Sequence, residues 1–375
     1  MNTPARIPPG IYNAIDYERL AAQHLPADRL AYIAGGCGWD QTVAANRAAF
    51  GQWAVLPRLL RDVRAGHTRR ALNGQDLPHP FFLAPVAHQR LAHPDAELAT
   101  ARAAEATATC LVASTLSSAP LEAIAQAAGS APRWFQLYLQ PERAHTLDLL
   151  ARAQAAGYTA IVLTLDASIQ LASRSALAAG FALPPECTAG NLAAYAPSAP
   201  APLAEGDSRI FQGAMRHAPI WDDLHWLLPA TRLPVWVKGV LHPDDARALQ
   251  AAGVAGLIVS NHGGRSLDGA PAALRQLPAV RAAVGADCPL LLDGGIRSGQ
   301  DAFKALALGA DAVLVGRLQM YALAAAGALG VAHMLTLLIE ELQACMAQAG
   351  CASPADITPE ALLPSCPTDP QAFPC

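Results

Sequence analysis

The segment Ser260-Asn261-His262-Gly263-Gly264-Arg265 places a histidine and an arginine three residues apart in a glycine-rich stretch. An imidazole can accept a proton near neutral pH, so His262 is a candidate general base. The guanidinium of Arg265 can form paired hydrogen bonds with a carboxylate, and glycine lets the backbone approach a flat ligand closely. These residue types indicate proton abstraction from an anionic substrate. The alternative is a polar loop with a solvated arginine.

Two further glycine-rich segments end in arginine. They are Asp293-Gly294-Gly295-Ile296-Arg297 and Gly316-Arg317, and each follows an apolar run. Glycine amides and a helix N-terminus can hold a phosphate, and the two arginines supply positive charge. The pair therefore predicts a phosphate site. Two tight turns that require glycine are the alternative.

Lys238 ends the apolar run at 235–238. Burial of an unpaired ammonium group is costly, so this lysine must either face the mouth of the fold or have an acidic partner. We expect it to stabilise negative charge in the site. A salt bridge at the rim is the alternative.

Eight short apolar runs alternate with helical segments from about residue 80 onward. They are Phe81–Ala84, Thr109–Ala113, Trp134–Leu139, Ala160–Leu165, Val235–Lys238, Gly256–Ser260, Leu290–Asp293 and Ala312–Gly316. Continuous apolar runs are typical of strands buried on both faces. Eight strand–helix units favour a closed α/β (β/α)8 barrel, or TIM barrel, over the alternative of a doubly wound sheet. The candidate residues fall at the carboxyl ends of these strands, where the active sites of such barrels lie.

We expect a single barrel domain over residues 1–375 with three additions. Residues 1–80 form an N-terminal helical cap, residues 178–218 a long insert after the fourth strand, and residues 352–375 a C-terminal tail. The insert is rich in alanine, proline and glycine, which predicts either a mobile lid or a disordered segment. Capping helices are expected at Ile11–His24, Ala27–Ile33 and Gln41–Phe50.

Composition excludes several classes of protein. A net charge of −4 provides no basic surface for nucleic acid. The first ten residues have no apolar core of a secretory signal, and we interpret Met320–Leu338 as a buried helix rather than a membrane span. Eight scattered cysteines lack a C-x-x-C pair, so we expect reduced thiols, no metal site and a cytoplasmic protein.

The motifs around His262, Asp293 and Gly316 resemble those of the FMN-dependent 2-hydroxy-acid oxidases and dehydrogenases, such as glycolate oxidase, lactate oxidase and mandelate dehydrogenase. The similarity extends from about Tyr17 to Cys351. It implies FMN as cofactor, oxidation of a 2-hydroxy acid to a 2-oxo acid, and reoxidation of the flavin by O2 or another acceptor. It also implies a homo-oligomer, in particular a tetramer.

The resemblance also implies residue roles. His262 matches the base, Asp166 the aspartate that orients it, Lys238 the lysine beside the flavin, and Arg265 the ligand of the substrate carboxylate. Tyr32 and Tyr138 match substrate-binding tyrosines, the second of them catalytic. The flavin ring and ribityl chain are matched by Pro85, Val86, Ala87, Ser114, Gln136, Thr164, Lys238 and Ser260. The ribityl-phosphate site is matched by Asp293, Gly294, Gly295, Ile296, Arg297, Gly316 and Arg317. Without the resemblance, Asp166 would be interpreted as a helix N-cap, and the tyrosines as core residues.

The sequence departs from the family pattern at the substrate. Ser173 occupies the place of a second carboxylate-binding arginine, and Arg174 follows it. A one-residue shift on an extended loop turns a side chain to the opposite face. Arg174 is therefore not expected to bind the substrate, and Arg265 is expected to be the main ligand of the substrate carboxylate. Leu116 replaces the tryptophan of glycolate oxidase, and Ala87 resembles the oxidases. The rival hypotheses are an FMN barrel enzyme for a neutral or extended hydroxy compound and a non-catalytic flavin-binding protein.

Overall fold

The computed structural model describes residues 6–72, 74–196 and 202–365. Its centre is a closed barrel of eight parallel strands in the order β10-β11-β4-β5-β6-β7-β8-β9. The strands are β4 (Phe81–Leu83), β5 (Cys110–Ala113), β6 (Arg133–Leu137), β7 (Ile161–Thr164), β8 (Val235–Val240), β9 (Gly256–Val259), β10 (Leu290–Leu292) and β11 (Ala312–Val315). The prediction of a (β/α)8 barrel is therefore confirmed. Each predicted apolar run overlaps one of the eight strands, although β6 begins one residue before its run and β8 ends two residues after its run.

Alternate side chains of these strands separate into two buried layers. One layer, which includes Phe82, Trp134 and Trp236, forms its own cluster of strand residues. The rings of Trp134 and Trp236 lie 4.8 Å apart between centroids. A Cβ atom at Gly256 would lie 2.3 Å from the Trp236 ring, so only glycine fits beside that indole. The other layer, including Phe135 and Leu163, packs in the larger core that contains the surrounding helices.

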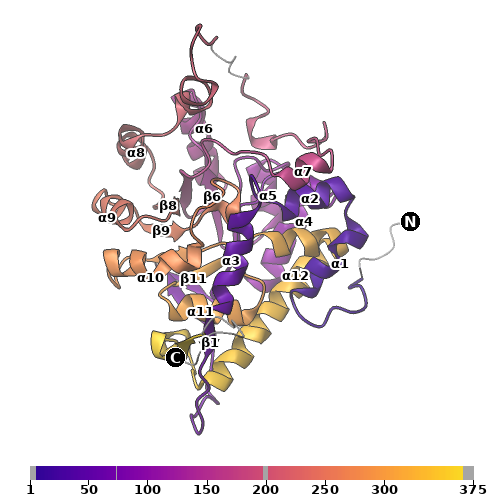
Figure 1. Cartoon of the computed structure of the whole chain (residues 1–375), viewed down its shortest axis with the longest axis vertical. Helices are drawn as coiled ribbons and strands as arrows, with labels where there is room; N and C mark the ends of the chain where they lie inside the picture. The colour runs from indigo at the N-terminus through magenta and orange to yellow at the C-terminus, as the bar shows by residue number, and fades with distance from the viewer. Residues whose placement is uncertain (1–5, 73, 197–201, 366–375) are drawn as a thin grey trace, which may run out of the picture.

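Helices surround the barrel (Figure 1). They are α4 (Ala96–Thr107), α5 (Leu121–Ala127), α6 (Arg143–Ala155), α8 (Trp221–Leu227), α9 (Pro243–Ala251), α10 (Ala273–Val284), α11 (Gly299–Ala307) and α12 (Arg317–Ala349). By length and composition, α12 is apolar enough to cross a membrane. However, half of its most apolar window is buried in the protein, and the helix packs against α1, α4 and α11. This packing is that of a core helix.

The N-terminal segment contains the three expected helices, α1 (Asp16–His24), α2 (Ala27–Ala34) and α3 (Gln41–Gly51). Helix α1 begins five residues later than expected, because the Asp16 carboxylate accepts hydrogen bonds from the Tyr12 and Asn13 amides and forms a turn there.

Short strands follow these helices. β2 (Arg70–Leu72) pairs with β3 (Gln75–Leu77), and β1 (Trp53–Val55) pairs antiparallel with β12 (Leu362–Pro364). The helical cap and the C-terminal tail are therefore joined by a two-stranded sheet that the sequence analysis did not predict. Residues 366–375 of the tail lie outside the described residues.

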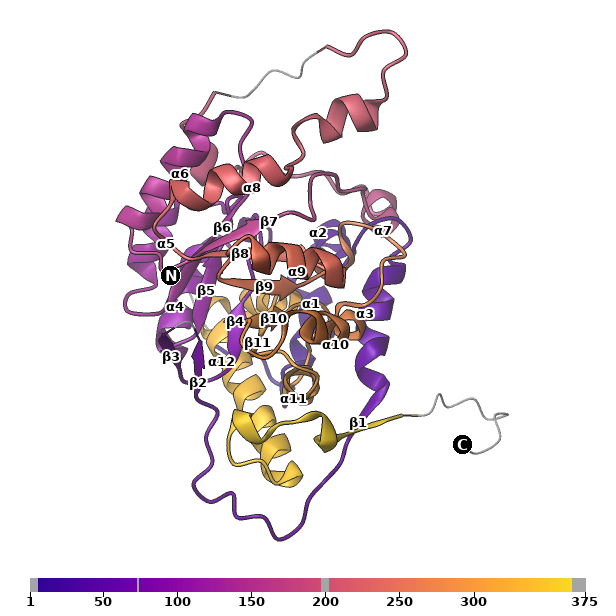
Figure 2. The same ribbon diagram turned by 90° about the vertical axis from the view of Figure 1, so that its left-hand side faces the viewer.

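The insert after β7 has two described parts around residues 197–201, which lie outside the described residues. The first part follows α7 (Arg174–Ala178) and is fixed to the barrel. The Asn191 amide donates to the Ser114 and Thr115 carbonyls, and its oxygen accepts from the Leu121 amide at 2.7 Å. The second part, residues 202–218, stands away from the barrel next to α8 (Figure 2).

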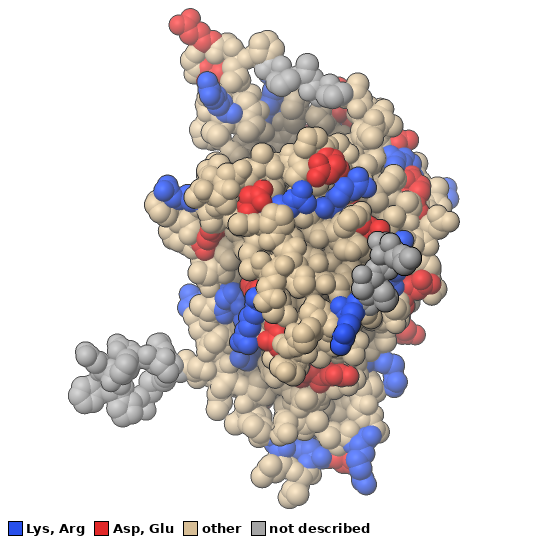
Figure 3. Space-filling view, turned by 90° about the vertical axis from the view of Figure 1, so that its right-hand side faces the viewer, with Lys and Arg blue, Asp and Glu red and all other residues tan. Residues whose placement is uncertain are grey.

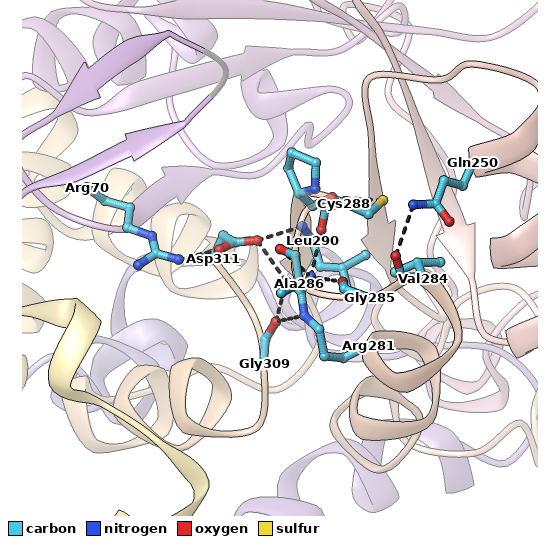
Figure 4. A network of polar contacts seen from close by, with 11 residues as sticks. Arg70, Gln250, Arg281, Val284, Gly285, Ala286, Cys288, Leu290, Gly309 and Asp311 are labelled. Carbon is cyan, nitrogen blue, oxygen red and sulfur yellow. Dashed lines mark hydrogen bonds and ion pairs between the residues drawn. The ribbon is translucent and has the colours of Figure 1, made fainter.

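A polar network holds the amino ends of β10 and β11, on the side of the barrel away from the predicted site (Figure 4). Asp311 accepts hydrogen bonds from the Leu290 amide at 2.9 Å and from Arg281 at 2.8 Å, and it also pairs with Arg70. Arg281 in addition donates to the Gly309 and Cys288 carbonyls. These contacts stabilise the fold, and the opposite ends of the strands remain available for the site.

Candidate active site

A cavity opens at the carboxyl ends of the barrel strands and encloses about 1150 Å³, including solvent at its mouth. Most of the predicted site residues line it: Tyr32, Pro85, Val86, Ala87, Ser114, Tyr138, Lys238, His262, Arg265, Asp293, Gly294, Gly295, Ile296, Arg297, Gly316 and Arg317. Asp166, Gln136, Thr164 and Ser260 do not line it. Asp166, Gln136 and Ser260 are instead hydrogen-bonded to residues that do, and Thr164 pairs with Lys238 in the sheet.

His262 is held by contacts on both its ring and its backbone. Its Nδ1 atom lies 2.8 Å from Asp166 Oδ1, and its amide donates to Ser260 Oγ at 3.0 Å. The backbone of His262 is in the left-handed region, with φ of 57°, which is uncommon outside glycine and occurs at functional sites. The next residues, Gly263 and Gly264, also have positive φ, and a Cβ atom at Gly264 would lie 2.8 Å from the Val43 amide nitrogen. The glycine-rich loop thus permits the turn that presents the imidazole to the cavity.

Lys238 lies between two carboxylates. Its Nζ atom is 3.1 Å from Asp293 Oδ2 and 4.0 Å from Asp166 Oδ2, and it donates to Ser260 Oγ at 2.8 Å. Burial alone would lower the pKa of Lys238, but the two carboxylates raise it well above its usual range. Burial alone would likewise raise the pKa of Asp166, but Lys238 and His262 lower it to about 2. The site therefore holds a fixed ammonium and a fixed carboxylate beside the histidine.

Arg265 is anchored at one edge of its guanidinium. Its Nη1 atom donates to the carbonyls of Tyr32 and Gly35 at 3.0 and 2.9 Å, and its Cζ atom lies 4.6 Å from the centre of the Tyr32 ring. Among the described residues, its Nε and Nη2 atoms have no hydrogen-bond partner. Two adjacent donors of this kind fit the two oxygens of a carboxylate.

Tyr138 is half-buried and follows β6, three strands along the barrel from β9, which Arg265 follows. Burial raises the pKa of its phenol to about 12, so the phenol is neutral and can donate a hydrogen bond at neutral pH. Tyr32 stacks on Phe181 with ring centroids 4.1 Å apart. Tyr32 thus presents a fixed ring to the cavity, which Tyr138 also lines.

Ser173 and Arg174, at the place of the family's second arginine, lie outside the cavity, whereas Leu116 lines it. Ser173 is buried, and its hydroxyl lies 2.6 Å from that of Ser175 and 3.4 Å from Asp40. Arg174 is exposed, and its Cζ atom lies 3.8 Å from the centre of the Trp39 ring. Ser173 is extended, pairs with Gly38 and caps helix α7, which begins at Arg174, so the expected extended loop ends here and the two side chains point in different directions. Arg174 therefore does not replace the second arginine.

The comparisons with known proteins match this geometry. The family model of the FMN-dependent dehydrogenases matches residues 21–364. The chain is 78% identical to an L-lactate oxidase of Alicycliphilus denitrificans, over 98% of this chain and all of that protein.

The chain belongs to the FMN-dependent dehydrogenase family.

Solved structures agree with this assignment. Mandelate oxidase with benzoyl-formic acid superimposes with a TM-score of 0.83 at 41% identity, over 94% of this chain and 97% of that one. A mandelate oxidase variant with a C4a-OH-FMN adduct has a TM-score of 0.82 at 41% identity, over 92% and 98% of the two chains. The expectations of an FMN cofactor and of oxidation of a 2-hydroxy acid are thereby confirmed.

The residues of this chain fit a flavin. Gln136 Nε2, Thr164 Oγ1 and Asp293 Oδ1 are buried and have no hydrogen-bond partner among the described residues. A buried polar atom without a partner is costly, and these atoms lie at the ends of β6, β7 and β10. Ser114 Oγ donates to Gln136 Oε1 at 3.2 Å and fixes the amide with its NH2 group free. Asp293 lines the cavity, and Gln136 and Thr164 are paired with Ser114 and Lys238, which line it. These strand ends thus offer unpaired polar groups to a flat ligand with a polar edge, such as the flavin ring.

The two arginines expected at the phosphate are already partly bonded. Arg297 forms an ion pair with Glu18 of α1. Arg317 donates to the carbonyls of Ile33, Gly35 and Gly263. Burial lowers the pKa of Arg317 to about 10, so it remains charged at neutral pH. A guanidinium has five N–H groups, and Arg317 therefore keeps two for a phosphate.

The sequence analysis did not identify some of the residues that line the cavity. They are Ile33, Ala84, His88, Leu91, Gln170, Leu314 and Met320. His88 directly follows Pro85-Val86-Ala87, so extension of that segment by one residue would have found it. Gln170 lies on the loop after Asp166, where periodicity gives no signal.

No group of three or more His, Cys, Asp and Glu side chains that could hold a metal occurs within residues 6–72, 74–196 and 202–365.

Proposed function

We propose that this enzyme oxidises L-lactate, or a closely similar short L-2-hydroxy acid, to the 2-oxo acid and passes the electrons to O2. The observation that carries the proposal is the pairing of His262 with Asp166 at 2.8 Å in the cavity that Arg265 also lines. The relative with 78% identity is named L-lactate oxidase, which supports this substrate.

The roles of the residues follow from their positions. Bound FMN accepts the two electrons of the oxidation. Arg265 holds the substrate carboxylate through Nε and Nη2, and Tyr138 donates its phenolic hydrogen to the substrate. His262 removes a proton from the substrate, and the charge on Asp166 stabilises the imidazolium that results. The ammonium of Lys238 offsets negative charge that develops beside it. Positioning of substrate and base in one cavity supplies much of the acceleration.

Hydrogen peroxide production tests the electron acceptor. With L-lactate in air we expect one H2O2 for each pyruvate, because two electrons pass to O2. Reduction of an artificial dye without O2 consumption would assign the protein to the dehydrogenases. Oxidation of L-lactamide at a rate equal to that of L-lactate would favour the alternative of a neutral hydroxy compound, because Arg265 would then have no carboxylate to bind.

We further propose a cytoplasmic homo-oligomer that binds neither nucleic acid nor membrane. The six cysteines within the described residues are free and buried, which suits a reducing compartment. Exposed apolar residues such as Leu59 and Leu329 suit subunit contacts. Basic and acidic side chains are interspersed on the face in Figure 3, and this pattern does not favour a polyanion.

A further inference from the structure

His88 is a second histidine in the active-site cavity, and the reaction as described does not use it. It follows the Pro85–Ala87 segment at the end of β4 and lines the cavity with Leu116. Its amide donates to the Leu116 carbonyl at 3.2 Å, so the two residues form one wall. Like His262, it has a left-handed backbone, with φ of 52°. Non-glycine residues hold this conformation only where their surroundings impose it.

The ring of His88 has no hydrogen-bond partner in the part of the chain that the structure describes. Its Nδ1 atom is enclosed by protein and unpaired, and its Nε2 atom makes no hydrogen bond with any described residue. A buried polar group without a partner costs free energy. Burial also lowers the pKa of this imidazole, so the ring is neutral at neutral pH and can either donate or accept a hydrogen bond.

The barrel order places His88 across the cavity from the reacting groups. His262 and Arg265 follow β9, whereas His88 follows β4 and Leu116 follows β5. In the closed order, β9 lies three strands from β4 and four strands from β5, and four strands is halfway around an eight-stranded barrel. A substrate whose carboxylate lies at Arg265 and whose C2 lies at His262 must direct its C2 substituent toward the opposite wall. That wall is Leu116 and His88.

We propose that His88 determines specificity by forming a hydrogen bond with a hydroxyl or carbonyl group on the C2 substituent of the substrate. The inference rests on the proposed function and refines its substrate class. The enzyme should then accept short 2-hydroxy acids with a polar group at C3, with L-glycerate as the simplest case. Leu116 provides the apolar contact that the methyl group of L-lactate also uses.

L-lactate and L-glycerate test the proposal because they differ only by the C3 hydroxyl. The FMN-loaded wild type, His88→Phe and His88→Gln are compared by kcat/KM on both substrates. Phenylalanine keeps a ring without nitrogen, whereas glutamine restores a hydrogen-bonding group on the same strained backbone. We expect the glycerate-to-lactate ratio to fall at least about tenfold in His88→Phe, or 1.4 kcal/mol, and to recover in part in His88→Gln.

Product binding provides a readout independent of turnover. Dissociation constants for hydroxypyruvate and pyruvate, from perturbation of the flavin spectrum, should show the same loss of preference in His88→Phe. An unchanged ratio, or an equal loss on both substrates, would overturn the role of His88. Turnover of L-lactate without any turnover of L-glycerate in the wild type would also overturn it. A wild-type flavin that neither acid reduces would instead overturn the proposed function, and this inference with it.

Discussion

Asp166 Oδ1 lies 2.8 Å from His262 Nδ1, although 96 residues separate the two in sequence. The contact fixes the ring so that Nε2 is the nitrogen available to the substrate, and it places a negative charge where an imidazolium would form. The same carboxylate lies 4.0 Å from Lys238 through its other oxygen. Asp166 thus links the base to the cation that lies beside it.

Asp166→Asn should slow flavin reduction by at least about 10²-fold with FMN still bound. The amide keeps the shape but loses the charge, and its NH2 group can favour the wrong tautomer of His262. Rapid mixing with L-lactate under anaerobic conditions measures the rate, and the flavin absorbance gives the FMN content. A rate within tenfold of the wild type would show that Asp166 does not assist the base.

Asp166 should also contribute to the pH dependence of stability. Its pKa in the folded state is lowered to about 2 from the usual 3.8. A lowered carboxyl pKa stabilises the folded state above the unfolded pKa, and this stabilisation is lost as the pH falls toward the folded pKa. The full contribution is about 2 kcal/mol, of which about 1 kcal/mol is lost between pH 6 and pH 3.

Urea unfolding of the apoprotein at pH 6, 4 and 3 tests this expectation. The wild type should lose about 1 kcal/mol more than Asp166→Asn over that range. The substitution also leaves Lys238 with one carboxylate fewer, which lowers the free energy of unfolding by a similar amount at each pH. Only the change with pH is compared, so this difference does not affect the result. Parallel pH profiles of the two proteins would contradict the lowered pKa.

Arg265 should be the main ligand of the substrate carboxylate. Arg265→Met should reduce kcat/KM for L-lactate by orders of magnitude, whereas Arg174→Met should change it less than about tenfold, or 1.4 kcal/mol. The reason is that Arg174 lies over Trp39 outside the cavity. Equal losses in the two variants would mean that the loop after β7 rearranges when substrate binds.

Arg317 should retain the cofactor. Arg317→Ala removes a charge at the end of β11 together with three hydrogen bonds to backbone carbonyls, so FMN should dissociate at least about tenfold more readily. Arg317→Lys keeps the charge and should lose less. Ultrafiltration after dilution measures bound FMN, with Arg265→Met as a control for general disruption. Full retention in Arg317→Ala would place the phosphate elsewhere.

The barrel could be predicted from the sequence because its strands are continuous apolar runs, whose burial on both faces leaves a local signature. Most cavity residues could be placed because they end those runs or carry specific motifs. The pairing of Trp53–Val55 with Leu362–Pro364 could not, because strands of three residues form only through a distant partner. The ion pair of Arg297 with Glu18 also depends on how α1 packs, which no local pattern encodes.

Anaerobic reduction of the flavin by L-lactate in wild type and His262→Ala tests the central claim most directly. The enzyme should reduce its flavin rapidly on mixing, and the variant should retain FMN but reduce it at least about 10²-fold more slowly, the usual contribution of a general base. Retained FMN with near-normal reduction in His262→Ala would contradict the assignment of His262 as the base.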